Sequence, residues 1–346
     1  MNRRVGLADG QVDIANEGIA EDPKLPCLAA ALEPAEIEAA LLPIVARVMG
    51  WTGTTRLIEA RLIRHKPGRR SVFYYELEVG ERIGVYGKMR ARGADLDTQN
   101  LLKELRGAGL ARASGGQTSV PRPLGCLPQW NMTLQEEAPG KLLSLALEEP
   151  DAPRSVKQVA EALFGLHRSG VKPHRAHAIS DELEILRGRL DDAAERAPAL
   201  RDRIAAVWQS ASRIAGQLPP VRALGIHRDF YPDQVMIDGD RTALLDLDLF
   251  ALGDPALDVG NFSAHLTEMA LREHGDPQRF KALEDAFEDR YRSLAPGVAS
   301  QSIRIYRLLT LARHIHLSMT LPGRSNTTTA ILDICEAELR ELGEQA

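Results

Sequence analysis

The residue types that could carry chemistry gather in one short stretch in the second half of the chain. Asp229 is a carboxylate, Gln234 is an amide five residues later, and Asp246 is a second carboxylate beyond the turn signal Asp238-Gly239-Asp240. Apolar runs flank this signal, so the stretch should fold back as a hairpin that brings the three side chains toward one end. Phosphoryl transfer needs such a set, because a carboxylate must accept the hydroxyl proton and hard oxygen ligands must hold magnesium.

Each of these residues has a predicted role. Asp229 is the candidate catalytic base, Asp246 the principal magnesium ligand, and the side-chain carbonyl of Gln234 a second ligand. Asp248 is also a candidate to approach the metal, because alternation along a strand would place it on the same side as Asp246.

The elements that must position these residues differ between the two parts of the chain. The first part has three segments of strand character that predict an antiparallel meander, followed by a short strand and preceded by a stretch of helical periodicity. A further helix follows the meander and stops at a glycine. The predicted strands are 57–64, 71–79, 82–89 and 131–135, and the predicted helices are 34–48, with a kink at Pro43, and 95–106.

The second part is mostly helical. A capping box of Ser155 and Gln158 predicts a helix start, and long amphipathic helices cover 180–217. A compact β-rich segment at 224–249 interrupts the helices, which resume at Asp258. The predicted organisation is an irregular segment at 1–33, a β-rich lobe at 34–135, a hinge at 136–140 and a helical lobe at 141–346.

The order of motifs around the hairpin resembles a known family. His227-Arg228-Asp229, an amide five residues after Asp229, Asp246-x-Asp248 and then Gly253 to Asp258 are similar to the signature of the aminoglycoside phosphotransferase and choline kinase family. The resemblance implies an α+β, protein-kinase-like fold with two lobes. It further implies ATP or GTP and Mg²⁺ as cofactors, and transfer to a hydroxyl of an aminoglycoside, sugar, amino alcohol or related metabolite. The family usually has Asn in place of Gln234 and commonly Gly in place of Arg228.

The same resemblance assigns a lysine to the nucleotide phosphates. Lys88 ends the third strand, where such kinases place the lysine that contacts the α- and β-phosphates, although a lysine at a strand end is by itself more often a solvated charge. Its glutamate partner on the following helix would be Glu104 or, in a shifted alignment, Asp97.

Two further segments match nucleotide-binding positions of the family. Residues 66–71 occupy the place of the nucleotide-covering loop, with Gly68 and Arg69 as candidate phosphate contacts. A tight hairpin turn without a nucleotide contact is an equally good interpretation. Gln135, Glu136 and Ala138 fall in the segment that resembles the hinge, where backbone groups would pair with adenine. Alternatively, this segment is an exposed linker between the lobes that makes no nucleotide contact.

Two other functions compete with a small-molecule kinase. His227, Asp229, Asp246 and Asp248 also fit the metal cluster of a metal-dependent phosphoesterase. A kinase-like fold that serves as a catalytically weak or inactive binding module is the second alternative. A protein kinase is disfavoured, because only eleven residues separate Asp246 from Asp258 and no segment able to dock a polypeptide follows.

Composition limits the remaining classes. The 346 residues carry a net charge of -5, which offers no footprint for nucleic acid, and no apolar run is long enough to span a bilayer. Three scattered cysteines and an acidic start predict a cytoplasmic protein, and the sequence specifies no oligomeric state. A polycationic acceptor would call for acidic side chains beside Asp229. The candidates, which a solvated helix face also explains, are Asp181, Glu182, Glu184, Asp191 and Asp192.

Overall fold

The computed structural model describes residues 13–15 and 21–344. It divides into two compact units. Unit 1 comprises the chain up to Gly107 together with Val120–Ala138, and unit 2 comprises Ala108–Ser119 and the chain from Pro139 onward. The last passage from unit 1 to unit 2, between Ala138 and Pro139, falls within the 136–140 segment.

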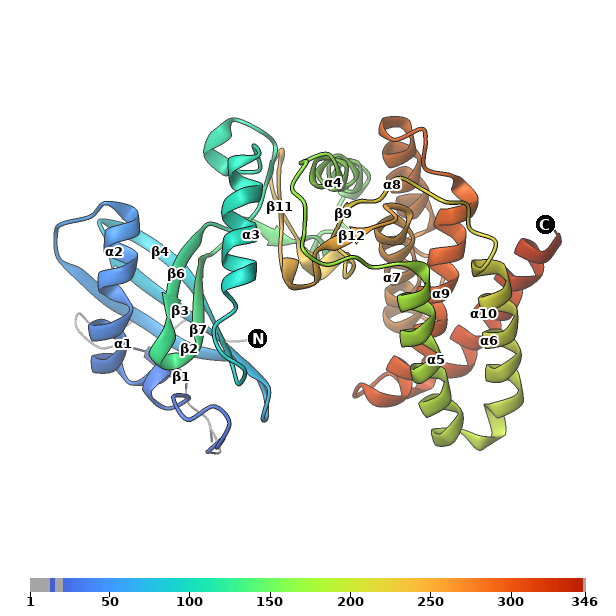
Figure 1. Ribbon diagram of the computed structural model, residues 1–346, viewed down its shortest axis with the longest axis horizontal. Coiled ribbons are helices and arrows are strands. Elements are labelled where there is room, and N and C mark those ends of the chain that lie inside the picture. The colour runs from blue at the N-terminus through green and yellow to red at the C-terminus, as the bar shows by residue number, and fades with distance from the viewer. Residues whose placement is uncertain (1–12, 16–20, 345–346) are drawn as a thin grey trace. The chain divides into compact units, whose positions relative to one another are not determined.

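Unit 1 is built on a six-stranded sheet with the order β1-β2-β3-β4-β7-β6 (Figure 1). The meander β2-β3-β4 is antiparallel, as its strand patterns predict, and β1 adds to its edge in parallel. Gly68 and Gly80 have φ of 67° and 78° at the two meander turns, a conformation that glycine adopts without a steric penalty. The strands are β1 Asp13–Ala15, β2 Thr55–Lys66, β3 Arg70–Val79, β4 Glu81–Arg90, β6 Pro123–Leu127 and β7 Met132–Glu136.

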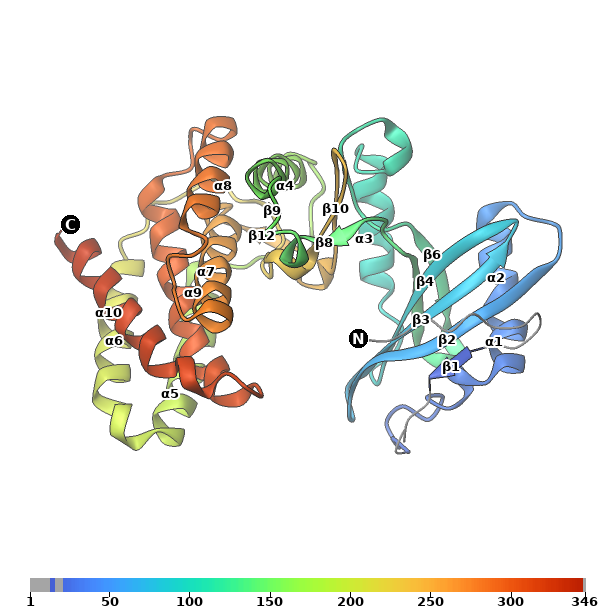
Figure 2. The same ribbon diagram turned by 180° about the vertical axis from the view of Figure 1, so that it is seen from behind.

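Three helices accompany this sheet, with α1 (Pro34–Ala40) and α2 (Leu42–Met49) on one side and α3 (Leu96–Gly107) on the other (Figures 1 and 2). The predicted single helix at 34–48 is two helices, because Pro43 lies at the start of α2 and cannot donate a backbone hydrogen bond. Alternate residues of the meander pack with α1 and α2 in one apolar core.

The predicted irregular segment 1–33 lies partly outside the described residues. Its described part is less irregular than the composition indicates, because Leu25, Leu28 and Leu32 are buried in the core of unit 1. A 3₁₀ turn, η1 (Ala30–Leu32), leads directly into α1.

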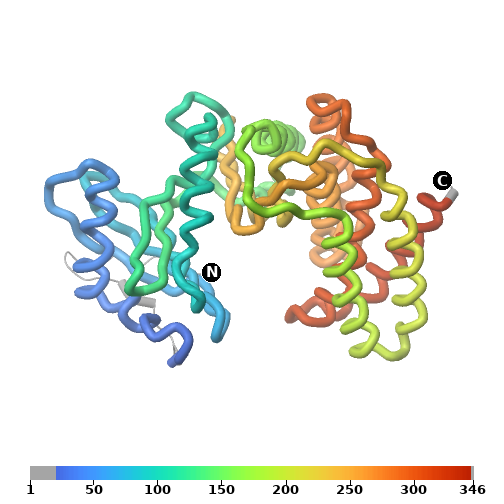
Figure 3. The backbone as a smooth tube through the Cα atoms, in the orientation of Figure 1, coloured from blue at the N-terminus to red at the C-terminus, as the bar shows by residue number. Residues whose placement is uncertain are grey.

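Unit 2 is a helical assembly with two small sheets, β5-β11-β10-β8 and β12-β9. After α6 the chain returns to β9, a path that can be followed along the tube in Figure 3. Strand β9 contacts α4. The last helix, α10, packs against α6 and α9 (Figure 2). In the described part of the chain no helix is both long and apolar enough to cross a membrane. The helices are α4 Ala152–His167, α5 Ile179–Arg196, α6 Arg201–Ala215, α7 Ala256–His274, α8 Lys281–Leu294, α9 Ser300–Thr320 and α10 Thr328–Glu344.

The short strands of unit 2 surround the predicted hairpin. They are β5 Thr118–Ser119, β8 Lys141–Leu142, β9 Leu224–Ile226, β10 Val235–Asp238, β11 Arg241–Leu244 and β12 Ala251–Gly253.

The predicted capping box at Ser155 is wrong. Helix α4 begins at Ala152, with Asp151 before it and Pro153 in its first turn, so Ser155 lies inside the helix and is buried. Proline at the first turn is a helix-start signal of its own, and here it decides the boundary.

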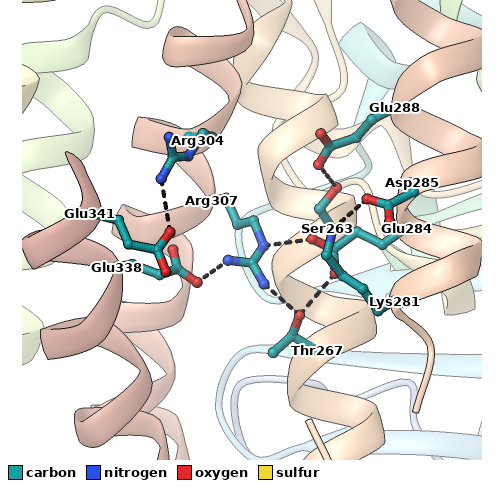
Figure 4. Close-up of polar contacts among 10 residues, drawn as sticks. All are labelled: Ser263, Thr267, Lys281, Glu284, Asp285, Glu288, Arg304, Arg307, Glu338 and Glu341. Carbon is teal, nitrogen blue, oxygen red and sulfur yellow. Dashed lines mark hydrogen bonds and ion pairs between the residues drawn. The ribbon is translucent and has the colours of Figure 1, made fainter. Parts of the chain in front are cut away.

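A buried ion-pair cluster joins the long helices of unit 2 (Figure 4). Arg307 of α9 contacts Glu284 of α8 through Nε at 2.8 Å, pairs with Glu338 of α10, and donates to Thr267 of α7 at 2.9 Å. Thr267 in turn donates to Glu284 at 3.1 Å. Because a charge that is largely removed from water must be paired, this cluster fixes α7, α8, α9 and α10 against one another.

Helices α7 and α9 also approach closely at a glycine. A Cβ added to Gly260 would lie 2.6 Å from the backbone nitrogen of Arg307 and 2.6 Å from the carbonyl oxygen of Ile303. Backbone atoms cannot move aside as a flexible side chain can, so this crossing depends on the missing Cβ.

Gly260→Ala should therefore destabilise unit 2 by about 1–3 kcal/mol, because overpacking forces the two helices apart. Urea unfolding followed by circular dichroism measures the change. Gly188→Ala is the matched control, since a Cβ at this helical glycine meets nothing within 4 Å and should instead stabilise by about 0.5–1 kcal/mol. Equal effects of the two substitutions would contradict the close approach.

Candidate active site

The predicted hairpin is present in unit 2. Strands β10 and β11 pair antiparallel from Val235↔Leu244 to Asp238↔Arg241, and Gly239 in the turn has φ of 62°. The pairing continues past the strands, because the Leu245 backbone N–H donates to the carbonyl oxygen of Gln234 at 2.8 Å. Gln234 and Asp246 therefore flank the open end of the hairpin.

Tyr231 follows Asp229 by two residues, and the pKa of its hydroxyl responds to the groups around it. Burial raises its pKa above the ordinary value, and the negative charges of Asp229 and Asp246 raise it further. The side chain of Gln234 is hydrogen-bonded to the same hydroxyl. Asp233 raises the pKa of Tyr231 as well, so this tyrosine, which sequence reasoning did not single out, lies in the field of three carboxylates.

Asp258 holds the 227–234 loop in shape. Its two carboxylate oxygens accept the backbone N–H groups of His227 at 2.6 Å and Arg228 at 2.7 Å, and one of them also accepts Nε2 of His167 at 2.9 Å. Helix α7 begins at Ala256, so Asp258 lies within its first turn and is not its N-cap. Asp258 therefore braces this loop, and both ring nitrogens of the buried His167 have hydrogen-bond partners.

Arg228 adopts a backbone conformation that favours glycine, with φ of 72°. A non-glycine residue in this region costs about 1–2 kcal/mol, and the bond from its N–H to Asp258 offsets that cost. This conformation gives a physical reason for the glycine that the resembling family commonly has here.

A second set of contacts anchors the residues on either side of Asp229. Nε2 of His227 donates to the carbonyl oxygen of Leu245 at 2.7 Å, which ties the loop to the residue before Asp246. The amide of Asn261 donates to the carbonyl oxygen of Phe230 at 2.9 Å. Because His227 uses this nitrogen for the backbone, it braces the loop. Asn261, which the sequence reading assigned no role, lies on α7 one turn after Asp258.

The conformation of Asp246 differs from the strand that the sequence predicts. Strand β11 ends at Leu244, Asp246 is left-handed with φ of 50°, and a 3₁₀ turn covers Leu247–Leu249. Aspartate tolerates this region better than most residues. The strand-alternation argument that placed Asp248 beside Asp246 is therefore wrong, because neither residue lies in a strand; a metal role for Asp248 stays a prediction.

Lys88 lies in unit 1 on strand β4, between β3 and β7, where it pairs with Val72 and Thr133. Both of its predicted acidic partners, Glu104 and Asp97, are exposed on α3, and neither carboxylate forms a hydrogen bond or ion pair within the described residues.

Gln99 lies on the buried face of α3 instead. Its amide donates to the carbonyl oxygen of Leu134 on β7 at 3.0 Å. This contact anchors α3 to the sheet through a neutral residue, and a single sequence offers no signal for it because it joins residues far apart in the chain.

The turn predicted to cover the nucleotide already contacts a carboxylate of this chain. The N–H of Gly68 donates to Asp22 at 2.7 Å, and the same oxygen of Asp22 is 3.6 Å from Nε2 of His65. The bond from Gly68 lowers the pKa of Asp22 below its ordinary value. Arg69 extends the turn, with its N–H bonded to the carbonyl oxygen of Lys66 at 3.0 Å. The phosphate contacts of Gly68 and Arg69 stay predictions.

The predicted hinge begins as a strand. Gln135 pairs with Tyr86, and the N–H of Glu136 donates to the carbonyl oxygen of Arg122 at 2.8 Å. Ala138 is half-buried and ends unit 1. Backbone pairing of these residues with adenine stays a prediction.

The donor set at the hairpin end suits a hard cation. Two carboxylates and a buried amide oxygen are ligand types that Mg²⁺ takes, and they need no thiolate or imidazole. Within residues 13–15 and 21–344 no group of three or more His, Cys, Asp or Glu side chains could hold a metal ion together. Binding of Mg²⁺ would therefore depend on Asp246 and Gln234. Waters and nucleotide oxygens are the other ligands that such sites use.

Solved structures of kinases share this fold. Choline kinase LicA from Streptococcus pneumoniae matches with a TM-score of 0.57 and 13% identity, over 89% of this chain and 97% of that chain. A choline/ethanolamine kinase family protein from Mesorhizobium loti matches with a TM-score of 0.52 and 17% identity, over 89% and 93%. Spectinomycin phosphotransferase, in complex with ADP and spectinomycin, matches with a TM-score of 0.55 and 11% identity, over 86% and 97%. The fold is therefore protein-kinase-like, with a β-rich N-terminal part and a helical C-terminal part.

The family match covers the hairpin and its anchoring helix. No curated protein matches the sequence significantly. The model of the phosphotransferase enzyme family matches residues 82–296, which is more than half of the chain and includes Lys88, the 227–234 loop, Asp246 and Asp258. The chain therefore belongs to the phosphotransferase enzyme family.

Proposed function

We propose that this protein is an ATP-dependent phosphotransferase that phosphorylates a hydroxyl group of a small polar molecule. The observation that carries the proposal is the hairpin that places Gln234 and Asp246 at its open end, directly after the loop that carries Asp229. Family membership supports the reaction class, and the structural relatives solved with ADP or the ATP analogue AMP-PNP support a nucleotide donor.

The residues have distinct proposed tasks. Asp229 would orient the acceptor hydroxyl and accept its proton. Asp246 and Gln234 would hold Mg²⁺, and Lys88 of unit 1 would contact the nucleotide phosphates. Bound Mg²⁺–ATP would supply the phosphoryl group and neutralise the charge that develops on it. The rigid 227–234 loop keeps Asp229 in one orientation, which lowers the entropy cost of reaching the reactive geometry.

The stretch after Asp246 supports a small acceptor. A 3₁₀ turn, strand β12 and the first turn of α7 fill the residues between Asp246 and Asp258. This compact connection leaves no length for a segment that docks a polypeptide. In the phosphoesterase alternative His227 would have to bind a metal through Nδ1, because its Nε2 is bonded to the backbone at Leu245.

The direct experiment is a coupled assay of nucleotide consumption by the purified protein against a panel of alcohols, sugars, amino alcohols and aminoglycosides. Consumption that depends on an acceptor, with a phosphorylated product seen by mass spectrometry, is expected. Hydrolysis of phosphate esters without any nucleotide would contradict the proposal.

Asp229→Asn should lower kcat by roughly 10²–10⁴-fold, because the amide cannot accept the hydroxyl proton. Nucleotide binding, measured by calorimetry, should change little, since Asp229 has no proposed contact with the nucleotide. Asp233→Asn is the matched control, because Asp233 is an exposed residue of the same loop. A kcat that Asp229→Asn leaves unchanged would remove Asp229 as the base.

Gln234→Leu should raise the Mg²⁺ concentration needed for half-maximal activity by about tenfold or more, because an oxygen ligand and the contact to Tyr231 are both lost. Gln234→Asn keeps an amide and should retain more activity than the leucine variant. A magnesium titration of the steady-state rate compares the three proteins. If the leucine variant responds to magnesium as the wild type does, Gln234 is not a ligand.

Asp258→Asn should lower stability by about 1–3 kcal/mol, because an amide N–H₂ would face buried donors that need an acceptor. It should also lower kcat while leaving the KM for nucleotide near its wild-type value, since Asp258 acts only through the loop. Asp276→Asn is the control, because this exposed carboxylate also accepts a backbone N–H, at 2.9 Å. Urea unfolding and steady-state kinetics test both effects. A rise in the KM for nucleotide as large as the fall in kcat would argue against a positioning role.

A further inference from the structure

A stack of aromatic rings leads from the 227–234 loop to helix α9. Tyr231, two residues after Asp229, stacks on His265 of α7 with ring centroids 4.7 Å apart and an interplanar angle of 19°. His265 meets His314 of α9 edge-on, with centroids 4.6 Å apart. Since Tyr231 belongs to the 227–234 loop that carries Asp229, the surroundings of His265 adjoin the proposed catalytic base.

Three arginines lie on the helices that carry these histidines or in the turn that follows. Arg272 follows His265 by two turns of α7, Arg313 precedes His314 on α9, and Arg324 lies in the turn after α9. Their side chains are 24%, 19% and 27% exposed, so each remains open to a ligand from solvent.

Two of these arginines share one buried carboxylate. Nε of Arg272 and a terminal nitrogen of Arg324 contact the same oxygen of Glu268, at 3.1 and 3.2 Å, so one buried carboxylate serves two guanidinium groups. Arg272 also contacts Glu273 at 2.9 Å, but the carboxylate of Glu273 is 43% exposed and solvent screens that pair. In the described part of the chain Arg324 uses this one side-chain contact, which leaves most of its five N–H donors for other acceptors.

Arg313 is bonded mainly to a neutral group. It donates to the side-chain oxygen of Asn261 at 2.8 Å, and its other terminal nitrogen is 3.8 Å from Glu182. Glu182 is already engaged by Nε2 of His177 at 2.8 Å. The positive charge of Arg313 is therefore only partly compensated.

The two histidines add no charge of their own. Burial lowers the pKa of His314 to about 3, and burial together with the nearby basic groups lowers the pKa of His265 well below its ordinary value. Nε2 of His314 is buried and has no hydrogen-bond partner among the described residues. A buried polar atom of this kind normally has a partner, which a ligand could supply.

Three of the five acidic residues that a polycationic acceptor would need, Glu182, Asp191 and Asp192, contact basic side chains. Asp192 accepts Nε of Arg196 at 2.7 Å and Nε2 of His316 at 2.7 Å. Asp191 is 3.7 Å from Nε of Arg187 on the exposed surface of α5. Glu268 is shared by two arginines, Glu273 is partly exposed and Glu182 also contacts His177, so none of the three arginines has a buried carboxylate to itself.

We propose that the acceptor carries an anionic group, a carboxylate or a phosphate ester, that binds Arg272, Arg313 and Arg324 beside His265. The inference rests on the proposed function and names its substrate class as a hydroxy acid or a polyol phosphate, in place of an aminoglycoside or choline. Guanidinium groups suit both anions, because their N–H donors match the oxygens of either in a forked geometry.

The test uses two sets of compounds, each with one carbon-chain length, whose members are neutral, anionic or cationic. The three-carbon set is glycerol, glycerate, glycerol 3-phosphate and 3-amino-1,2-propanediol, and the six-carbon set is glucose, gluconate, glucose 6-phosphate and glucosamine. Binding to the full-length protein without nucleotide is measured by calorimetry at constant ionic strength. At least one acidic member should bind about tenfold or more tightly than its neutral parent, and the amines should bind no better than that parent. The carboxylate and phosphate members distinguish the two anions.

Arg272→Gln and Arg324→Gln should each weaken binding of that acid by about tenfold or more. Arg292→Gln, at an exposed arginine near the end of α8, is the matched control and should leave binding unchanged. The KM for nucleotide should not change in the Arg324 variant, which separates an acceptor site from a nucleotide-phosphate site. Circular dichroism confirms that each variant is folded, and Arg324→Lys, which keeps the charge, should restore part of the affinity.

The outcomes separate the two proposals. Acid binding that needs the arginines, together with nucleotide consumption stimulated by the same acid, supports both. Acid binding without consumption in the presence of any acceptor would overturn the proposed function and leave the anion site standing. Tighter binding of a neutral or amino compound, acid binding that the arginine variants do not change, or no acid binding at millimolar concentration would overturn the anionic acceptor.

Discussion

The carboxylate of Asp258 is fully buried, and three donors, two of them consecutive backbone N–H groups, converge on its oxygens. An ionised group removed from water is tolerated only when its lone pairs are satisfied, so the 227–234 loop can take few other shapes without leaving this charge uncompensated. The left-handed conformation of Arg228 follows from this constraint. His167, which accepts from the hydroxyl of Tyr291 on its second nitrogen at 2.7 Å, extends it to α4 and α8.

Helix α7 transmits the constraint to the rest of unit 2. Its first turn carries Asp258, Asn261 holds the carbonyl oxygen of Phe230, and Phe262 stacks on the ring of Phe230 with centroids 5.4 Å apart. Further along the same helix, His265 faces Tyr231. One helix therefore sets the orientation of the proposed base and forms part of the proposed acceptor surface, so the chemical groups can stay constant while residues farther along α7 and α9 change specificity.

Local chemistry made the central part of the site predictable. The Asp-Gly-Asp turn at 238–240 specifies a hairpin through the φ of Gly239, and the hairpin then places Gln234 and Asp246 at one end because pairing register follows from turn geometry. The meander of unit 1 was predictable for the same reason, since alternation and turn residues act over a few positions. Where two local signals compete, as the capping box at Ser155 competes with Pro153, sequence reasoning chose the wrong one.

The sequence by itself determined the hairpin and which residues beside it are candidates for the chemistry. Only the tertiary structure decided what holds and surrounds them: His167 meets Asp258 across 91 residues, Asp22 meets Gly68 across 46, and α3 turns Gln99 rather than Glu104 toward the sheet. Such pairs carry no local pattern, because they depend on how whole helices pack and which buried charges must be paired. The arginines of the proposed anion site come together in the same way, since they lie on α7, on α9 and in the turn that follows α9.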